Sequence, residues 1–137
     1  MYSKIYLVDD EEIMIFMHRI LLRKIGEEEK VLSYINPEEA LDHLRFNKDK
    51  SEAILVLLDI NMPEMDGFEF LEFMVLEEMS TNIDVVLVTS SISEDDKRLA
   101  KDFPNYVQDF VSKPLNVEKL QELVHGSKVK KVTRKQK

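Results

Sequence analysis

Short hydrophobic runs rich in β-branched residues alternate along this chain with stretches in which hydrophobic residues recur every three or four positions. Short runs of this kind are typical of buried strands, and the longer period is typical of helices with one hydrophobic face. The expected strands are Lys4 to Val8, Lys30 to Tyr34, Ala53 to Leu58, Asp84 to Thr89 and Val107 to Val111. Five strands that each precede a helix predict an α/β protein with a parallel sheet covered by helices on both faces.

Two of the helical stretches have a recognisable hydrophobic side. In the first, the regularly spaced residues are Ile13, Met17, Ile20, Leu21 and Ile25. In the second they are Phe68, Leu71, Met74 (or Val75) and Met79. Because residues three and four apart lie on the same side of a helix, these side chains are expected to pack against the sheet.

The other helices are indicated by residues that favour a first turn. Asn36 offers a capping side chain ahead of Pro37 and two acids, and Ser93 stands in the same way ahead of three acids. Asn116 can cap the last helix, and Asp66 can cap the helix that follows the third strand. Side chains of these types accept hydrogen bonds from the free N–H groups of a first turn.

Length and composition mainly exclude certain classes of protein and of metal site. A chain of 137 residues with 44% hydrophobic residues is expected to form one domain. No run approaches the roughly 20 hydrophobic residues of a membrane helix, and the N-terminus lacks the features of a secretory signal, so a cytoplasmic location without membrane contact is expected. With no cysteine and three widely separated histidines (His18, His43 and His125), any metal is expected to have oxygen ligands.

Charge is unevenly distributed along the chain. The last ten residues carry six positive charges and no acid, so a chain of net charge −8 carries −14 elsewhere. We therefore expect a folded domain over residues 1–126 and a basic, disordered tail over residues 127–137. The acidic body argues against nucleic acid as a partner.

Polar residues that can carry chemistry follow the predicted strands. Asp9 and Asp10 end the first strand, Asp59 ends the third, Thr89 ends the fourth and Lys113 follows the fifth. In an open parallel sheet, ligands bind beyond the carboxyl ends of the strands, which meet at one edge. Residues more than a hundred positions apart are thus expected to converge on one site.

The acids in this set repel one another unless a cation neutralises them. Mg²⁺ prefers oxygen ligands and keeps water molecules that a phosphate can replace. Asp9 and Asp10 could instead stabilise the start of the helix before Ile13, because acids favour that end of a helix. Their combination with an acid, a hydroxyl and a lysine on other strand ends favours a metal site.

Four segments in order, YLVDDEE, LVLLDINMPEMDGFEFL, VVLVTSS and DFVSKP, resemble the receiver domain of two-component response regulators. The resemblance extends from about residue 3 to residue 126, and we interpret the chain as a stand-alone, single-domain receiver. It implies a flavodoxin-like (βα)5 fold with five parallel strands in the order 2-1-3-4-5 and helices on both faces. The chain departs from the usual pattern at Tyr106 and Val107, where receivers usually have Gly and Ala.

The resemblance also implies a role for each acid of the site. Asp59 is identified as the phosphoacceptor. Mg²⁺ would be held by Asp9, Asp10, Asp59 and the backbone carbonyl of Asn61. A carboxylate is a weak nucleophile, and a cation that offsets charge repulsion and aligns the attack makes such phosphoryl transfer feasible.

Three further residues gain roles in the same way. Thr89 and Lys113 resemble the hydroxyl and the amine that contact the phosphoryl group, and Phe110 matches an aromatic switch residue. The peptide between Lys113 and Pro114 resembles a cis bond that aims the lysine into the site. On this hypothesis Thr89 moves toward the phosphoryl group, and the ring of Phe110 turns into the space that Thr89 leaves.

The resemblance implies a signalling domain that is not an enzyme in its own right. A histidine kinase or a histidine phosphotransfer protein would supply the phosphoryl group, and a downstream protein target would receive the signal. The expected output surface is formed by the fourth helix, the fifth strand and the fifth helix. It includes Lys97, Lys101, Tyr106 and Lys119.

Other functional classes fit the sequence less well. An aspartate-nucleophile phosphatase needs a second acid two residues after the nucleophile, where this chain has Asn61. A calcium loop starting at Asp59 would need Gly and Glu where Glu64 and Phe70 stand. A phosphorylation-independent interaction module is the remaining alternative, and the intact set of acid, hydroxyl and lysine argues against it.

Overall fold

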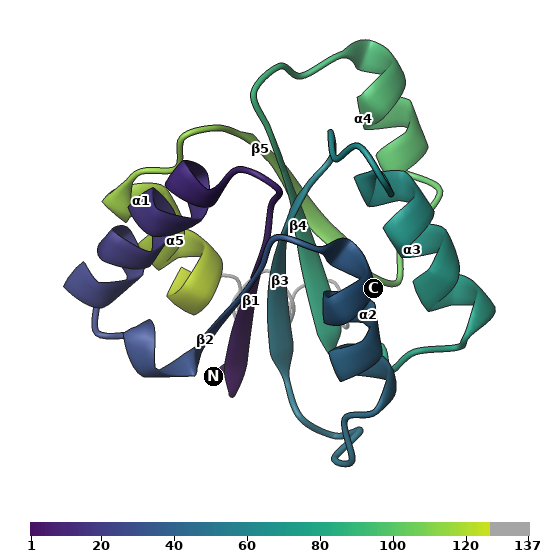
Figure 1. Cartoon of the computed structure of the whole chain (residues 1–137), viewed down its shortest axis with the longest axis horizontal. Coiled ribbons are helices and arrows are strands. Elements are labelled where there is room, and N and C mark those ends of the chain that lie inside the picture. The colour runs from purple at the N-terminus through teal and green to yellow at the C-terminus, as the bar shows by residue number, and fades with distance from the viewer. Residues whose placement is uncertain (127–137) are drawn as a thin grey trace.

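Strands and helices alternate along residues 1–126, which are the residues that the computed structural model describes (Figure 1). The strands are β1 (Lys4–Val8), β2 (Val31–Tyr34), β3 (Ile54–Asp59), β4 (Ile83–Thr89) and β5 (Val107–Ser112). The helices are α1 (Glu12–Lys24), η1 (Glu28–Lys30), α2 (Pro37–Arg45), α3 (Gly67–Leu76), α4 (Glu94–Ala100), α5 (Val117–Gln121) and η2 (Glu122–Gly126). The predicted basic tail, residues 127–137, lies outside the described residues.

The five strands form one parallel sheet in the order β2-β1-β3-β4-β5. Helices α1 and α5 cover one face of the sheet, and α2, α3 and α4 cover the other (Figure 1). The prediction of a flavodoxin-like (βα)5 fold is therefore confirmed. Because all strands run in one direction, their carboxyl ends meet at one edge of the sheet.

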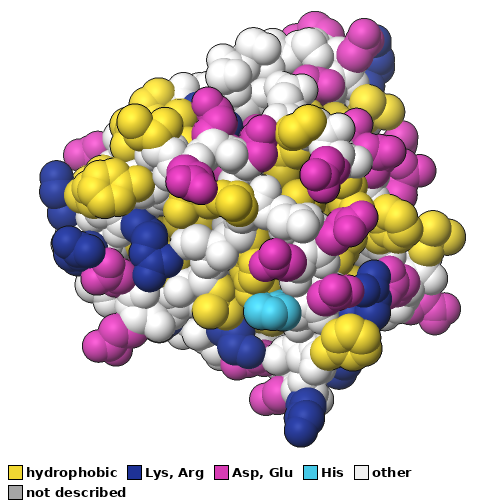
Figure 2. Space-filling model, viewed as in Figure 1, with side chains coloured by type: hydrophobic (Ala, Val, Ile, Leu, Met, Phe, Trp, Pro, Cys, Tyr) yellow, Lys and Arg dark blue, Asp and Glu magenta, His cyan; other side chains and the backbone are white. Residues whose placement is uncertain are grey.

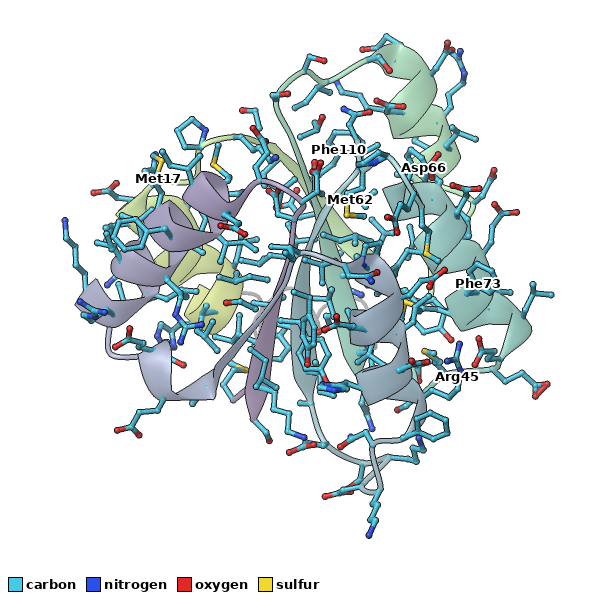
Figure 3. The ribbon with its side chains drawn as sticks, viewed as in Figure 1. Met17, Arg45, Met62, Asp66, Phe73 and Phe110 are labelled. Carbon is cyan, nitrogen blue, oxygen red and sulfur yellow. The ribbon has the colours of Figure 1, made fainter. Side chains whose placement is uncertain are left out.

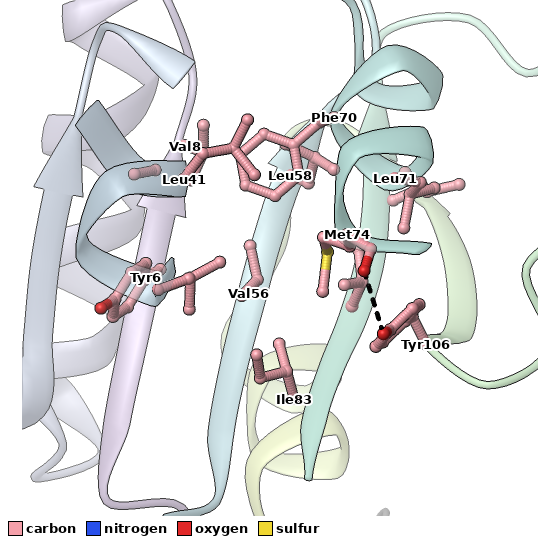
Figure 4. Packing of buried hydrophobic residues seen from close by; sticks show 14 of the residues in the cluster. Tyr6, Val8, Leu41, Val56, Leu58, Phe70, Leu71, Met74, Ile83 and Tyr106 are labelled. Atoms are coloured by element: carbon pink, nitrogen blue, oxygen red, sulfur yellow. Dashed lines mark hydrogen bonds between the residues drawn. The ribbon is translucent and has the colours of Figure 1, made fainter. Parts of the chain in front are cut away.

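Two hydrophobic layers sandwich the sheet. Successive side chains of a strand point to opposite faces, so Tyr6 of β1 packs toward α2 and α3 while Ile5 packs toward α1 and α5. Figure 4 shows the first layer, in which Val56 of β3 and Met74 of α3 lie in the same cluster. Every residue of β3 is buried, as expected for a central strand covered on both faces.

The strand boundaries differ from the predictions by one residue at most. Lys30 belongs to η1 and Ala53 precedes β3, so the second and third strands begin one residue later than predicted. The fourth begins earlier, at Ile83, and the fifth ends later, at Ser112. Asp59 lies inside β3 as its last residue. A carboxylate is unusual in a buried strand, and at this position it faces the functional edge of the sheet.

The predicted hydrophobic face of α1 is only partly correct, because Leu21 and Ile25 pack against the core while other predicted positions do not. The buried residues of this helix are Ile15, His18 and Leu22. Ile13 and Met17, which were expected to face the core, are 68% and 40% exposed, and Figure 3 shows Met17 on the outer side of the helix. The other predicted positions lie at the margin of the buried face and are half-buried, namely Ile20, Leu21 and Ile25. Hydrophobic residues occur on every side of α1, so periodicity alone did not select the buried side.

In α3 the choice between Met74 and Val75 is resolved. Met74 is buried with Leu71, whereas Val75 is exposed. Phe68 and Met79 are partly buried and pack against the same cluster. The predicted face of this helix is therefore confirmed with Met74.

The predicted helix caps are confirmed at four helices. The side chains of Asn36, Asp66, Ser93 and Asn116 each accept a backbone N–H in the first turn of α2, α3, α4 and α5. At α3 the cap is reciprocal, because the Glu69 side chain accepts the Asp66 N–H. Helix α1 differs, because its N-cap residue makes no capping hydrogen bond with its side chain.

Tyr106 does not lie on a surface, which corrects the predicted output face. Its side chain is buried and its hydroxyl donates to the carbonyl of Met79 at 2.5 Å. A second contact, 3.3 Å to the carbonyl of Met74, is drawn in Figure 4. Tyr106 thereby joins the start of β5 to the end of α3 and to the segment that follows it.

Tyr106→Phe should lower the free energy of unfolding by about 1–2 kcal/mol, because the Met79 carbonyl loses its donor. The ring is kept, so the variant removes the hydrogen bonds and little packing. Urea denaturation of the variant and the wild type measures the difference. Equal unfolding free energies would show that water replaces the tyrosine hydroxyl without cost.

Candidate functional site

The carboxyl ends of β1, β3, β4 and β5 bring the predicted site residues together. Asp9 and Asp10 follow β1, Asp59 ends β3, and one carboxylate oxygen from each lies within 4.8 Å of the others. Asp9 and Asp59 are buried, and Asp10 is exposed. Lys113 follows β5 and reaches the two buried acids. The predicted convergence on one edge of the sheet is confirmed.

Lys113 is the centre of an ion-pair network. Its side chain is 3% exposed, and Nζ lies 2.8 Å from Asp9 Oδ2, 2.9 Å from Glu11 Oε1 and 3.3 Å from Asp59 Oδ1. Burial opposes the charge of the amine, but the hydrogen bonds to Asp9 and Glu11 outweigh burial and raise its pKa. The lysine is therefore a cation at neutral pH.

The main chain fixes where the Lys113 side chain begins. Its backbone N–H donates to the carbonyl of Thr89 at 2.7 Å, which ties β5 to the end of β4. The peptide bond to Pro114 is cis, as the resemblance implied. The backbone of Lys113 is therefore held in place, and the amine can move only by rotation of the side chain.

Asp59 is held in an environment that opposes its charge. It is 3% exposed, and burial together with the negative charge of Asp9 raises its pKa to about 7. Lys113 and the backbone N–H of Asn61, 3.3 Å from Asp59 Oδ1, lower the pKa by less. A cation bound beside Asp59 would favour its ionised form.

The donor set suits Mg²⁺. All three clustered ligand atoms are carboxylate oxygens, which hard divalent cations prefer, and the exposed Asp10 leaves the site open to water. Mutual repulsion among the acids, visible in the raised pKa of Asp59, is the condition that a divalent cation relieves. Asp9, Asp10 and Asp59 are thus the residues that could hold the ion.

The segment between β3 and α3 returns the chain closely past Asp59. The N–H of Gly67 donates to the carbonyl of Ile60 at 2.9 Å. A Cβ atom at Gly67 would lie 2.9 Å from the backbone oxygen of Asp59, so only glycine permits this approach. Met62 and Met65 are buried and anchor the loop. The sequence placed Gly67 in the helix start but gave no sign of its close approach to the end of β3.

Thr89 is fully buried at the end of β4. Its hydroxyl donates to the carbonyl of Ser91 at 3.1 Å, and Nδ2 of Asn61 lies 3.5 Å from Oγ1. In this structure the Thr89 hydroxyl is therefore hydrogen-bonded to the loop after β4. To contact a group on Asp59, it would have to leave the Ser91 carbonyl.

Phe110 owes its direction to an irregularity between β4 and β5. Val85 pairs with Val107 and Val86 pairs with Asp109, so β5 contains one additional residue at this point. Val107 and Phe110 consequently pack on the α3 side of the sheet. Phe110 is half-buried and also lines a shallow cavity of about 350 Å³.

Two residues of this region were missed by the sequence reasoning. Glu11 pairs with Lys113, and the only sign in the sequence is a glutamate at a helix N-cap, where shorter polar residues are preferred. His18 is buried, and its Nε2 accepts the N–H of Leu115 at 3.3 Å. Burial lowers the pKa of His18, which favours the neutral ring that can accept this bond. The sign of His18 in the sequence was a histidine next to Arg19, with hydrophobic residues on both sides of the pair.

A family model described as the response regulator receiver domain matches residues 5–125. The chain belongs to this receiver domain family. Receiver domains are the phosphoacceptor signalling domains of two-component systems, and members of the family generally are not enzymes in the usual sense. The prediction of a response regulator receiver is therefore confirmed.

Curated relatives of this receiver domain come from archaea and plants. The probable methanogenesis regulatory protein FilR2 of Methanothrix harundinacea is 31% identical over 126 residues, which are 90% of this chain and 80% of the relative. The two-component response regulator ARR10 of Arabidopsis thaliana is 32% identical over 93% of this chain. The match covers 22% of ARR10, so this chain spans about a fifth of the plant relative.

Solved receiver structures share the fold. A two-component response regulator from Cytophaga hutchinsonii has a TM-score of 0.75 at 26% identity, over 90% of this chain and 94% of that one. A CheY-like receiver domain protein from Methanospirillum hungatei has a TM-score of 0.76 at 21% identity, over 98% and 99% of the two chains. Within residues 1–126, no helix combines the length and the hydrophobicity needed to cross a membrane.

Proposed function

We propose that this receiver domain accepts a phosphoryl group on Asp59 in a Mg²⁺-dependent reaction, and that the modification controls contact with a downstream protein. One observation carries the proposal. The carboxylate of Asp59 is buried at the end of a central strand, clustered with two other acids and 3.3 Å from the ammonium of Lys113. This arrangement combines a nucleophile, candidate metal ligands and a cation for a phosphoryl oxygen.

The transfer follows from these positions. A carboxylate oxygen of Asp59 attacks the phosphorus of a phosphohistidine, and the bond from phosphorus to the histidine nitrogen breaks. The nitrogen keeps the electron pair, and the phosphoryl group becomes an acyl phosphate on Asp59. Lys113 offers positive charge to a phosphoryl oxygen. Mg²⁺, held by Asp9, Asp10, Asp59 and the Asn61 carbonyl, would neutralise negative charge at the site.

The surface of α1 supports a protein as the phosphodonor. Ile13, Phe16 and Met17 are exposed on this helix, directly after the acids of the site. Figure 2 shows hydrophobic side chains gathered over α1. An exposed hydrophobic patch of this kind is typical of an interaction site. We infer that a histidine kinase or histidine phosphotransfer protein docks here and places its phosphohistidine over Asp59.

The signal would leave the site through Thr89 and Phe110. A phosphoryl group on Asp59 offers new acceptors to the Thr89 hydroxyl, which now donates to the Ser91 carbonyl. As Thr89 moves, the ring of the half-buried Phe110 can turn inward and change the cavity that it lines with Ile92 and Lys119. That cavity is lined by β5, the loops after β4 and β5, and α5, and we place the surface for the downstream target there. Phosphorylation then shifts the populations of two existing states.

The site favours the switch over the alternative functions. A phosphatase of the aspartate-nucleophile class would need an acid at position 61, and Asn61 instead contacts Asp59 and Thr89. A module that works without phosphorylation would not need a buried lysine between three carboxylates.

Asp59→Asn should abolish phosphorylation. The wild-type protein, given Mg²⁺ and acetyl phosphate, is expected to gain one phosphoryl group by intact mass, and this group should be lost at alkaline pH. The matched control is Asp102→Asn, which removes one exposed carboxylate outside the site and should be labelled like the wild type. Labelling of Asp59→Asn at the wild-type rate would overturn the assignment of the phosphoacceptor.

A further inference from the structure

Glu11 contacts the lysine of the site although it belongs to none of the predicted functional sets. Its Oε1 lies 2.9 Å from Lys113 Nζ, as close as the buried Asp9 and closer than Asp59. The Glu11 side chain is 53% exposed, whereas those of Asp9 and Asp59 are buried. Glu11 is therefore the one partner of Lys113 that can leave it and still be solvated.

The position of Glu11 at the start of α1 points to this contact. Helices α2, α3, α4 and α5 each have an N-cap side chain that accepts a backbone N–H, and α1 alone among these five has an N-cap residue, Glu11, without such a bond. Asparagine, aspartate or serine would cap this helix better than glutamate. The Glu11 carboxylate reaches Lys113, where a shorter capping side chain would turn back to the helix.

Lys113 Nζ is surrounded by carboxylates, because it donates a hydrogen bond to Glu11 and lies within ion-pair distance of Asp9 and Asp59. An ammonium group has three N–H donors, and Lys113 Nζ faces one oxygen each of Asp9, Glu11 and Asp59. The Glu11 backbone is itself held in place, because its N–H donates to Asp9 Oδ1 at 2.9 Å. Phosphorylation turns the Asp59 carboxylate into an acyl phosphate, so Lys113 must turn toward the new phosphoryl oxygens, and the exposed Glu11 is the partner that it can leave at the lowest cost.

We propose that Glu11 is a positioning residue that holds Lys113 in its resting place and thereby restrains phosphorylation of Asp59. The inference rests on the proposed function of Asp59. Glu11 does not touch the reacting atoms, and it acts only through the lysine. Because Glu11 is half-exposed, the effect of the pair is modest, and its removal should speed phosphorylation by about two- to fivefold.

The decisive comparison is Glu11→Gln against Glu12→Gln. Glu12 is the next residue, is exposed and is not a partner of Lys113, so the two variants remove the same charge from the same turn. Initial labelling by acetyl phosphate and Mg²⁺ should be about two- to fivefold faster than wild type in Glu11→Gln and close to wild type in Glu12→Gln. Equal rates in the two variants, or slower labelling of Glu11→Gln, would overturn the inference.

A second measurement tests the contact without metal or phosphodonor. In NMR spectra recorded at neutral pH, the signals of the Lys113 side chain should shift in Glu11→Gln relative to the wild type, because the hydrogen bond to Glu11 is lost. In Glu12→Gln these signals should stay at their wild-type positions. Unchanged Lys113 signals in Glu11→Gln would show that the pair does not exist in solution and would overturn the inference.

Glu11→Asn separates the structural role of this position from the functional one. Asparagine can cap α1, so the melting temperature should rise by about 2–5 °C, while labelling should accelerate as in Glu11→Gln. A stabilised variant that is labelled at the wild-type rate would contradict the inference. Failure of the inference alone leaves labelling dependent on Asp59, whereas labelling of Asp59→Asn would overturn the proposed function as well.

Discussion

Replacing Asp59 by asparagine should stabilise the metal-free protein by roughly 3–4 kcal/mol at pH 8 and by far less at pH 4. The reason is the free-energy cost of ionising a carboxyl group that is buried beside the carboxylate of Asp9. In an unfolded chain an aspartate has a pKa of about 3.9. In the folded protein the pKa of Asp59 is raised to about 7.

The sign follows from the protons that each state binds. Below about pH 3 Asp59 is protonated in both states and does not change their balance. As the pH rises toward 7, the unfolded chain has released this proton while the folded protein still holds it, so stability falls. Above that pH the folded protein bears the full cost, because each pKa unit is worth about 1.4 kcal/mol. Asparagine cannot ionise, so this loss disappears.

Urea denaturation in the presence of a chelator, at several pH values between 4 and 8, measures the effect. Asp102→Asn is the matched control and should follow the wild-type curve. Adding Mg²⁺ at pH 8 should stabilise the wild type far more than Asp59→Asn, because ligand binding to the folded state raises its stability. Equal stability of the wild type and Asp59→Asn in metal-free solution at pH 8 would contradict the raised pKa.

Gly67→Ala should destabilise the protein by about 2 kcal/mol, although the same exchange usually stabilises a helix. The added methyl group would lie 2.9 Å from the Asp59 backbone oxygen and 3.1 Å from Cα of Ile60. Both neighbours are backbone atoms, so the start of α3 or the end of β3 must shift. Because Asp59 is the residue displaced, phosphorylation should slow together with the loss of stability.

The comparison requires both thermal unfolding and labelling by acetyl phosphate. Glu72→Ala is a suitable control in the same helix, because Glu72 is exposed, and its effect on stability should stay within about 0.5 kcal/mol. A Gly67→Ala variant as stable as the wild type would mean that α3 moves away from the strand without cost. In that case the close approach of α3 to Asp59 would not be needed for function.

The sheet and the edge that carries the site could be predicted because their signals are local. The run from Ile54 to Leu58 is continuously hydrophobic and is followed at once by Asp59, so strand and functional end are adjacent in the sequence. Capping residues such as Asn36 act on N–H groups a few positions away, so helix starts can be predicted from the sequence in the same way.

The buried side of α1 could not be predicted in the same way. Residues 13–17 are all hydrophobic, so each side of the helix offers apolar surface to the core. The choice depends on His18, whose acceptor nitrogen meets the Leu115 N–H from a loop 97 positions away. Periodicity assigns a histidine to the outer side unless its partner is known.

Partners distant in the sequence also explain the other differences. Tyr106 was placed on the output surface by the family resemblance, but the carbonyls that receive its hydroxyl belong to Met74 in α3 and Met79 just beyond it. Glu11 was read as one more acid in a crowded segment. Its role depends on Lys113, which is 102 positions away.

The hydrogen bond from the Leu115 amide to His18 makes α1 and the lysine loop parts of one unit. The helix that presents the hydrophobic patch thus also holds the backbone two residues beyond Lys113. Coupling free energies are reciprocal. If a donor protein on α1 changes the balance between the positions of the lysine, phosphorylation must change the affinity of that donor by the same factor. The donor protein would then bind the unphosphorylated and the phosphorylated receiver with different affinities. The imidazole of His18 would be the link between the two sites.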